Sequence, residues 1–189
     1  MTPAQRRALV EALHDHPARL VLAVTGGGVA IVTDLLLVPG ASRTVLEATV
    51  PYSTPALAQL VGGAPTQAVS AATAAAMAQA CLRRASVLAA ADAGPLLGVG
   101  CTAALATDRQ RRGVNHAHLA IAASERADRA GSDAGIASWH LELDKTLERG
   151  RDAEDRLTAD AVLAAIAAVC GLEPPLAPAL APSDRLARS

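Results

Sequence analysis

Short apolar runs alternate with helix-like segments in the first half of the chain. Residues 19–24 are apolar at nearly every position, which is typical of a central parallel strand with both faces buried. A short buried helix over 29–37 and a second strand within 43–53 follow, and 94–108 contain a third buried strand and a loop. Strands and helices that alternate in this way predict an α/β sheet with parallel strands.

Three helices begin with recognisable capping residues. Thr2 caps the first helix, with Gln5 at the spacing of a capping box, and this helix stops before Pro17. Thr54 stands before a proline at the start of the second, and Ser70 caps a long Ala-rich helix. We therefore expect helices that begin directly after these caps.

The second half of the chain changes to a two-residue alternation. Residues 115–124 and 136–144 predict two strands, the second with Trp139, Leu141 and Leu143 on one face. A charged turn then introduces a last helix, which we place at Ala159 to Cys170.

These elements predict a three-layer α/β/α sandwich with a mixed, mainly parallel central sheet. We assign residues 1–172 to one domain and expect the Pro/Ala-rich residues 173–189 to be extended or disordered. Aromatic residues make up only 1% of the chain, so the core must consist of Ala, Val and Leu. Such small side chains favour close packing of helix on sheet.

Charge and composition exclude several classes of function. A net charge of −1 provides no field that would hold nucleic acid or an anionic membrane. The N-terminal segment is charged throughout and no apolar run approaches the length of a membrane span, so we expect a cytoplasmic protein. The three cysteines are far apart without CxxC spacing, which argues against disulfides and against a zinc site. We expect no cofactor and no bound metal.

Thr25-Gly26-Gly27-Gly28 follows the first strand and opens a helix. Ligands of α/β sheets bind at the carboxyl ends of strands, and the N-terminus of a helix attracts anions. Glycines let the backbone approach a phosphate or carboxylate closely. The stretch therefore predicts a small-molecule anion site; the alternative is a tight strand-to-helix turn without a ligand. It matches neither a Rossmann fingerprint nor a Walker loop.

A charged loop follows the third strand. Asp108, Arg109, Arg111 and Arg112 stand where the rim of a pocket would lie. Guanidinium groups bind phosphate in a bidentate manner, so this loop is a candidate clamp for a nucleotide. The alternative is a solvated turn.

Histidines occur on both predicted strands of the second half. His116 and His118 share one face of the first, and His140 and Glu142 share one face of the second. A metal site or an acid/base pair would be conceivable if these faces met in a pocket. Polar alternation on a solvent-facing strand explains the same residues without a function, and we expect the latter.

Cys101 directly follows the apolar part of the third strand, next to Thr102. In that place it is a candidate nucleophile, although a cysteine there is more often a small buried hydrophobe. Cys81 and Cys170 lie on Ala-rich helix faces and are expected in the core.

Five segments, in this order, resemble a known family: VTGGG, VPGAS, VPYS, AVSAATAAAMAQ and GVGCTA. They are similar to the C-terminal domain of the competence/damage-inducible protein CinA, the nicotinamide mononucleotide amidohydrolase family, over about residues 19–171. The resemblance implies an α/β/α domain, a homodimer, and a pocket around the T-G-G loop. It also implies hydrolysis of the carboxamide of nicotinamide mononucleotide, with a serine nucleophile and a lysine activator.

The chain departs from this family at both catalytic positions. Alignment on Thr25 places Ala23 where the serine belongs, and alignment on Tyr52 and Ser53 places Leu57 where the lysine belongs. A methyl group cannot attack a carbonyl and a leucine cannot accept a proton, so the mechanism does not carry over. The flanking Glu and Cys of the family's E-S-C-T-G-G motif are also replaced, by Leu22 and Val24.

Three functional hypotheses remain. The first is a domain that binds a phosphorylated nucleoside, such as a pyridine nucleotide, without turnover. The second is an active amide hydrolase that uses Cys101, Ser53 or Thr25 in a rebuilt site, with Tyr52 as a further candidate. The third is an interaction domain with a vestigial pocket. The predicted ligand-binding residues are Thr25, Gly26, Gly27, Gly28, Ser42, Tyr52, Ser53, Thr102, Asp108, Arg109 and Arg112.

Overall fold

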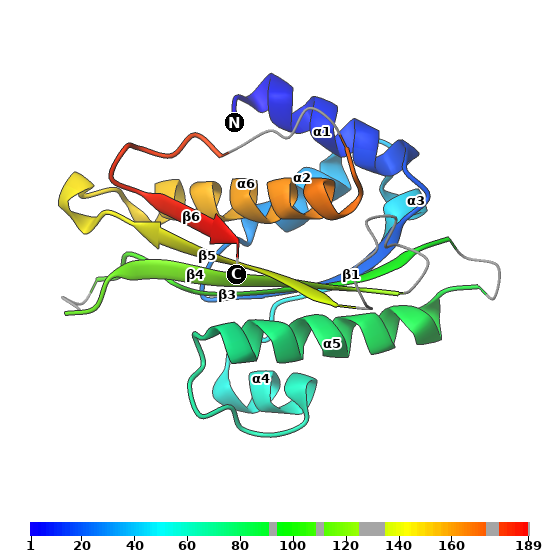
Figure 1. The fold of residues 1–189 in the computed structure, drawn as a ribbon, viewed down its shortest axis with the longest axis horizontal. Coiled ribbons are helices and arrows are strands. Elements are labelled where there is room, and N and C mark those ends of the chain that lie inside the picture. The colour runs from blue at the N-terminus through cyan, green and yellow to red at the C-terminus, as the bar shows by residue number, and fades with distance from the viewer. Residues whose placement is uncertain (91–93, 109–111, 125–134, 173–177, 189) are drawn as a thin grey trace.

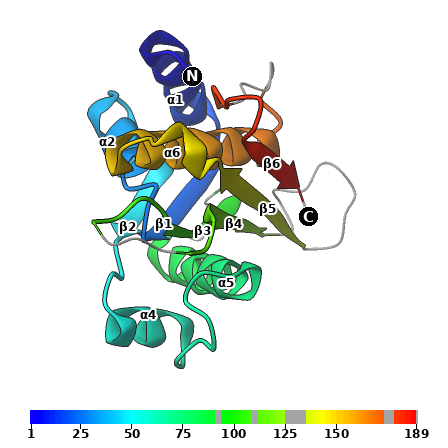
Figure 2. The ribbon, with the colours of Figure 1, turned by 90° about the vertical axis from the view of Figure 1, so that its left-hand side faces the viewer.

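A computed structural model describes residues 1–90, 94–108, 112–124, 135–172 and 178–188. Within these residues a six-stranded sheet has the order β2-β1-β3-β4-β5-β6 (Figures 1 and 2). The strands are β1 (Arg19–Thr25), β2 (Val45–Thr49), β3 (Leu96–Ala104), β4 (Asn115–Ala123), β5 (Ile136–Leu143) and β6 (Arg185–Arg188). β1 pairs in parallel with β2 and β3, and the pairs from β3 to β6 are antiparallel. The predicted mixed sheet is confirmed, and its parallel part consists of the strands that come first in the chain.

Helices cover both faces of this sheet (Figure 2). On one face lie α1 (Pro3–Asp15), α2 (Ala30–Leu37) and α6 (Arg151–Val169); on the other lies α5 (Ala71–Leu88), with α4 (Thr54–Val61) packed against it. The short helices are α3 (Ala41–Thr44) and η1 (Lys145–Leu147). The three-layer α/β/α prediction is confirmed. Among the described residues, no helix has the length and apolar character that crossing a membrane requires.

The close packing expected from small side chains is most evident between α5 and β3. A Cβ at Gly98 would overlap the backbone of α5 at the Ala78 carbonyl and the Leu82 amide, and a Cβ at Gly100 would come within 2.5 Å of the Ala74 carbonyl oxygen. The alanines of α5 and the glycines of β3 thus bring the two backbones together without large side chains between them.

Most helix starts agree with their predicted caps. Thr2 and Gln5 form the expected capping box, and the Ser70 hydroxyl accepts a hydrogen bond from the Thr73 amide at the start of α5. Helix α4 begins one residue earlier than predicted, because Ser53 rather than Thr54 is the N-cap and accepts from the Ala56 amide.

Helix α6 begins at Arg151 and not at Ala159. Its first two turns are rich in charged residues, so the apolar pattern does not reveal them as helix. They are helical because their polar side chains contact other elements. Glu154, only 1% exposed, accepts hydrogen bonds from the Ala106 amide at 2.6 Å and from Asn115 Nδ2 at 2.7 Å.

The predicted order of elements ends with this helix, whereas the tail contributes the further strand β6. Leu186 pairs in register with Leu141 of β5, and the guanidinium of Arg188 lies 5.6 Å from the centre of the Trp139 ring. Just before β6, the Asp184 carboxylate accepts hydrogen bonds from the Asp144 amide and from Arg149. These contacts join residues 181–188 to the edge of the sheet.

Acidification is expected to destabilise the fold through Asp160, whose carboxylate accepts hydrogen bonds from Arg6 Nε at 2.7 Å and from the Met1 amino group at 2.8 Å. Burial acts to raise the pKa of Asp160, but these two bonds and the charges of Arg6 and Arg156 together lower it below 3.8. A carboxyl group with a lower pKa in the folded state stabilises the fold above its unfolded pKa and stops doing so as the pH falls through the folded pKa. Urea titrations should therefore show the free energy of unfolding falling below about pH 4, and falling less steeply in Asp160→Asn. Equal slopes in both proteins would contradict this assignment.

Candidate active-site cleft

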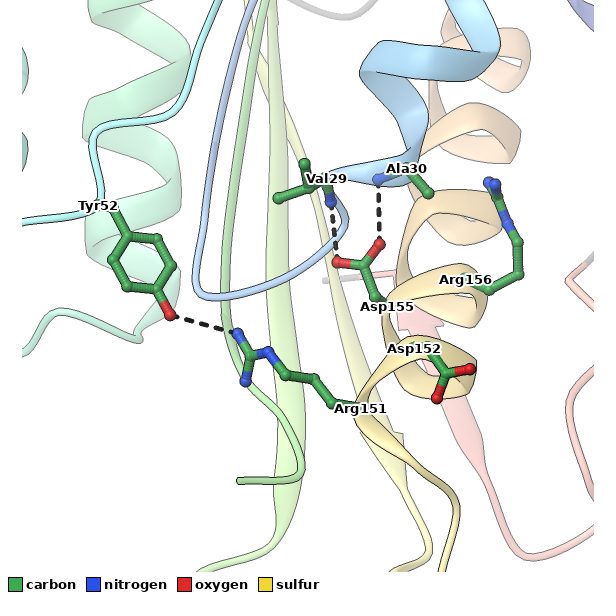
Figure 3. A pocket seen from close by; sticks show the side chains of 7 residues that line it. All are labelled: Val29, Ala30, Tyr52, Arg151, Asp152, Asp155 and Arg156. Carbon is green, nitrogen blue, oxygen red and sulfur yellow. Dashed lines mark hydrogen bonds between the residues drawn. The ribbon is translucent and has the colours of Figure 1, made fainter. Parts of the chain in front are cut away.

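An open cleft of about 790 Å³ lies at the carboxyl end of β1 (Figure 3). It is formed by the start of α2, the segment between β2 and α4, and the start of α6. The lining residues are Val29, Ala30, Tyr52, Arg151, Asp152, Asp155 and Arg156. Its volume is within the range of small-molecule sites, and its place in the sheet is where α/β proteins bind ligands.

The glycine loop leads into Val29 and Ala30 of the cleft but is not part of its lining, and close packing explains its composition. Gly26 and Gly28 have positive φ angles of 73° and 79°, which favour glycine. A Cβ on Gly26 would overlap the Ala103 carbonyl oxygen, and one on Gly27 would overlap the side chain of Leu105. The tight turn by itself therefore explains why glycines stand here.

The N-terminus of α2 already has an anion of the protein's own. The two carboxylate oxygens of Asp155 accept hydrogen bonds from the amides of Val29 and Ala30, each at 3.0 Å (Figure 3). This corrects the expectation that these helix amides face an incoming phosphate. Asp155 of α6 accepts hydrogen bonds from two N–H groups that have no partner within α2. Its negative charge lies at the positive end of the α2 dipole.

Arg151, in the first turn of α6, connects three loops at the mouth of the cleft. Its Nη2 donates to the Gly26 carbonyl at 2.9 Å and its Nη1 to the Ala106 carbonyl at 3.0 Å. Its Nη2 also lies 3.5 Å from the Tyr52 hydroxyl (Figure 3). The side chain is exposed, so this guanidinium is held in place and remains within reach of solvent.

Some of the other charged groups of the cleft are bound to protein groups, and others are exposed to solvent. Arg156 forms ion pairs with Asp34 and Asp160, and Asp155 is bound to α2 as described. Asp152 is exposed at the rim. The groups best placed to meet a ligand are therefore Arg151, Asp152 and the phenol of Tyr52, which is 67% exposed.

Two of the predicted site segments, the glycine loop and the segment of Tyr52 and Ser53, lie side by side near this cleft. The Thr25 hydroxyl donates to the Pro51 carbonyl at 3.0 Å and so joins the glycine loop to the segment that carries Tyr52. Ser53 follows directly, but its hydroxyl serves as the cap of α4. Thr25, Gly26 and Tyr52 thus lie close together, with Ser53 beside them.

Other predicted residues do not join the cleft. Ser42 is exposed on α3, which precedes β2 at the amino ends of the parallel strands, so the length of β1 separates it from the glycine loop. Thr102 is completely buried, and its hydroxyl donates to the Ala68 carbonyl on the α5 side. Asp108 and Arg112 are exposed on the loop after β3 and do not line the cleft. Arg109 and Arg111 lie outside the described residues.

Cys101 has the properties of a core residue. It is fully buried, and burial together with the charge of Asp155 raises the pKa of its thiol to about 12. The thiol is therefore protonated at neutral pH, where a nucleophile needs the thiolate. The thiol donates a long hydrogen bond to the Gly27 carbonyl, with 3.9 Å between Sγ and the oxygen.

Ala23 and Leu57, the positions that the resemblance aligns with a serine and a lysine, lie in one apolar cluster. Ala23 has no exposed surface and Leu57 is 4% exposed. The buried members of the cluster are Val21, Ala23, Leu57, Met77, Cys81 and Ala85. Where the family motif has a hydroxyl and an amine, this chain therefore has hydrocarbon side chains packed between β1, α4 and α5.

The charged residues of α6 are the part of the cleft that the sequence analysis missed. Arg151, Asp152 and Asp155 lie more than a hundred positions from the glycine loop. In the folded chain Arg151 contacts Gly26, and Asp155 contacts the amides at the start of α2. An Arg and an Asp four residues apart are a common pattern on any exposed helix, so the sequence holds no specific signal for them.

Solved structures share this fold. The competence/damage inducible protein CihA from Agrobacterium tumefaciens superposes with a TM-score of 0.62 at 22% identity, covering 89% of this chain and 98% of that one. A CinA superfamily protein from Enterobacter cloacae gives 0.56 at 15% identity, over 89% and 88% of the two chains. One from Escherichia coli gives 0.53 at 16%, over 84% and 82%. No family model and no curated protein matches the chain. The chain thus has a CinA-like fold.

Proposed function

We propose that this protein binds a phosphorylated nucleoside, with a pyridine nucleotide as the first candidate, in the cleft beside the glycine loop, and that it does not hydrolyse the carboxamide. The observation that carries this proposal is Arg151. Its guanidinium is exposed at the carboxyl end of β1 and is oriented there by two backbone carbonyls.

The charged groups of the cleft suit the parts of such a ligand. A guanidinium is the side chain that best recognises phosphate oxygens, because its N–H groups bind them in pairs. Asp152 can accept hydrogen bonds from ribose hydroxyls, and the exposed ring of Tyr52 offers a flat surface to a base. The phosphate is thus assigned to Arg151 and not to the amides of α2, which Asp155 occupies.

The residues around the glycine loop support the proposed absence of turnover. Hydrolysis of an amide needs a nucleophile and a group that takes its proton. Ala23 and Leu57 supply neither, the Ser53 hydroxyl accepts from the α4 amide, and the Cys101 thiol is buried and protonated. The hypothesis of a rebuilt hydrolase site is therefore our second choice.

Replacing Arg151 tests the binding site. In calorimetry with nicotinamide mononucleotide and nicotinic acid mononucleotide, Arg151→Ala should weaken binding by about tenfold to a hundredfold, since hydrogen bonds to a charged group contribute about 1.5–3 kcal/mol each. Arg83→Ala removes the same charge from an exposed position on α5 and is the matched control. Equal affinity of the Arg151 and Arg83 variants would contradict the assignment, and no binding by the unmodified chain would favour an interaction domain.

An ammonia-release assay on the same nicotinamide mononucleotide distinguishes binding from catalysis. We expect binding without release. Steady ammonia release that is lost in Ser53→Ala or Cys101→Ala would overturn the noncatalytic proposal and establish the rebuilt hydrolase instead.

A further inference from the structure

The histidines of β4 and β5 meet on one face of the sheet. In the antiparallel register His118 lies opposite His140, and His116 lies opposite Glu142. Residues directly opposite one another in such a pair project from the same face. Three imidazoles and a carboxylate therefore stand at the four corners of one cross-strand square, so the faces left separate by the sequence pattern do come together.

The three rings of this square are in mutual contact. His118 and His140 stack with centroids 4.4 Å apart and planes at 6°. The ring of His116 lies 5.5 Å from that of His118 and 5.8 Å from that of His140. In the described part of the chain, no three His, Cys, Asp or Glu side chains are placed to hold a metal ion. Because a charge on one ring opposes a charge on either neighbour, the three rings cannot all take up protons without repulsion.

The charged groups around the square are mostly basic. On β5, Glu142 Oε1 lies 3.7 Å from His140 Nδ1. On β6, Arg185 pairs with Glu142 in the register and so stands on the same face. Lys145, just after β5, donates from Nζ to the Gly113 carbonyl at 2.9 Å and adds a cation near the start of β4. Among these groups, protonation of the rings leaves cations in excess of the Glu142 carboxylate.

Strand β3 and helix α5 present uncharged residues to the square. On β3, Thr102 lies opposite His118 and Ala104 lies opposite His116. Helix α5 packs on β4 beside the square, and its buried contacts there are alanines. These residues cannot neutralise an imidazolium ion, so a proton on His118 is costly as long as the strands stay paired.

We propose that the square is a pH-sensitive element that holds β5 on β4: neutral rings keep the two strands paired, and protonation below about pH 6 opens this end of the sheet. The stacked His140 covers one face of His118, so that His118 is fully hydrated only when β5 moves away. β5 and the four-residue β6 are the last strands at this edge of the sheet. Because Trp139 and Leu141 of β5 are buried on its other face, the open form is a minor population, which acid enlarges.

The proton affinity of His118 supports this element and gives the direction of its response. The pKa of His118 is lowered to about 4, first by burial and then by the charges of His140 and His116, whereas an exposed histidine titrates near 6.5. Between these two values the open form takes up a proton that the closed form does not. The pairing is therefore fully stable above about pH 6.5 and weakens as the pH falls toward 4.

Hydrogen exchange of the full chain at pH 7 and pH 5, measured by mass spectrometry, tests the proposal. Protection factors, which remove the intrinsic pH dependence of exchange, should fall about twentyfold in β4 and β5, as linkage to one proton with pKa values of about 4 and 6.5 requires. In His118→Gln they should fall by about twofold or less. His16→Gln, which changes a histidine of the α1–β1 connection, is the matched control and should respond as the unmodified chain does.

Comparison with β1, which lies between β2 and β3, shows whether the opening is confined to this end of the sheet. β1 should remain more strongly protected than β5 at both pH values. Amides of β1 that exchange as fast as those of β5 would mean that the pair opens only with the whole fold, and would overturn the proposal. Equal protection of β5 at pH 7 and pH 5, or equal losses in His118→Gln and His16→Gln, would overturn it as well.

Histidine ring resonances in NMR provide a second readout, which does not require His118→Gln to fold. The His118 ring should titrate near pH 4, and in His140→Gln, which removes the stacked ring, its pKa should rise toward 6.5. A His118 ring that titrates near 6.5 in the unmodified chain would contradict the proposal. Circular dichroism at both pH values shows that each protein is folded before the comparison. None of these outcomes depends on nucleotide binding in the cleft.

Discussion

Gly98→Ala is expected to lower the free energy of unfolding by about 3 kcal/mol, although it adds a single methyl group. That methyl group would overlap backbone atoms of α5, at the Ala78 carbonyl and the Leu82 amide. Backbone atoms within a helix cannot turn aside as a side chain does, so the whole helix must shift away from β3. Denaturant unfolding followed by circular dichroism measures the loss.

Gly63→Ala is the matched control for this experiment. A Cβ at Gly63 meets nothing within 4 Å, and its φ is not in the left-handed region. The same chemical change there should alter stability by about 0.5 kcal/mol or less. If the Gly98 and Gly63 variants were equally stable, the close contact between α5 and β3 would not exist as described.

Leu57→Lys is expected to lower the free energy of unfolding by about 3 kcal/mol or more, because it places an ammonium group without a partner in an apolar cluster. Leu57 is 4% exposed and packs with Ala23, Met77 and Cys81. This is also the position at which the resemblance to the amidohydrolase family calls for a lysine. The experiment therefore asks whether the chain still has room for that catalytic group.

Leu57→Met keeps the volume and the apolar character, and should cost less than about 1.5 kcal/mol. Comparing the two variants separates the effect of the charge on the free energy of unfolding from the effect of a changed side-chain shape. A Leu57→Lys protein as stable as Leu57→Met would mean that the cluster is open to water. In that case the combined variant Ala23→Ser, Leu57→Lys becomes the natural test of whether this site can support amide hydrolysis.

Much of the fold could be predicted because its signals are local. The capping box of Thr2 and Gln5, the cap at Ser70 and the alternation around Trp139 each depend on residues within one or two turns or along one strand. The position of Tyr52 near the glycine loop could also be anticipated, since the carboxyl ends of β1 and its parallel neighbour β2 lie at the same edge of the sheet.

The predictions failed where contacts between distant segments replace local signals. The charged start of α6 has no apolar stripe and depends on bonds such as that of Glu154 with the Ala106 amide. Residues 185–188 form β6 only because the edge of β5 is available to pair with them. The Pro/Ala-rich sequence of the tail does not itself reveal that this edge is available.

The sequence by itself determined the layers of this protein, its small-residue packing and the turn at Thr25 to Gly28, because backbone propensity, caps and periodicity act over a few residues. Only the tertiary structure decided which charges meet at that turn. It placed Asp155 on the amides that had been expected to receive a phosphate, set Arg151 at the mouth of the cleft, and joined three histidines of two strands into one square. Such contacts depend on strand register and on the docking of a helix more than a hundred residues away, and these are properties of the packed chain as a whole.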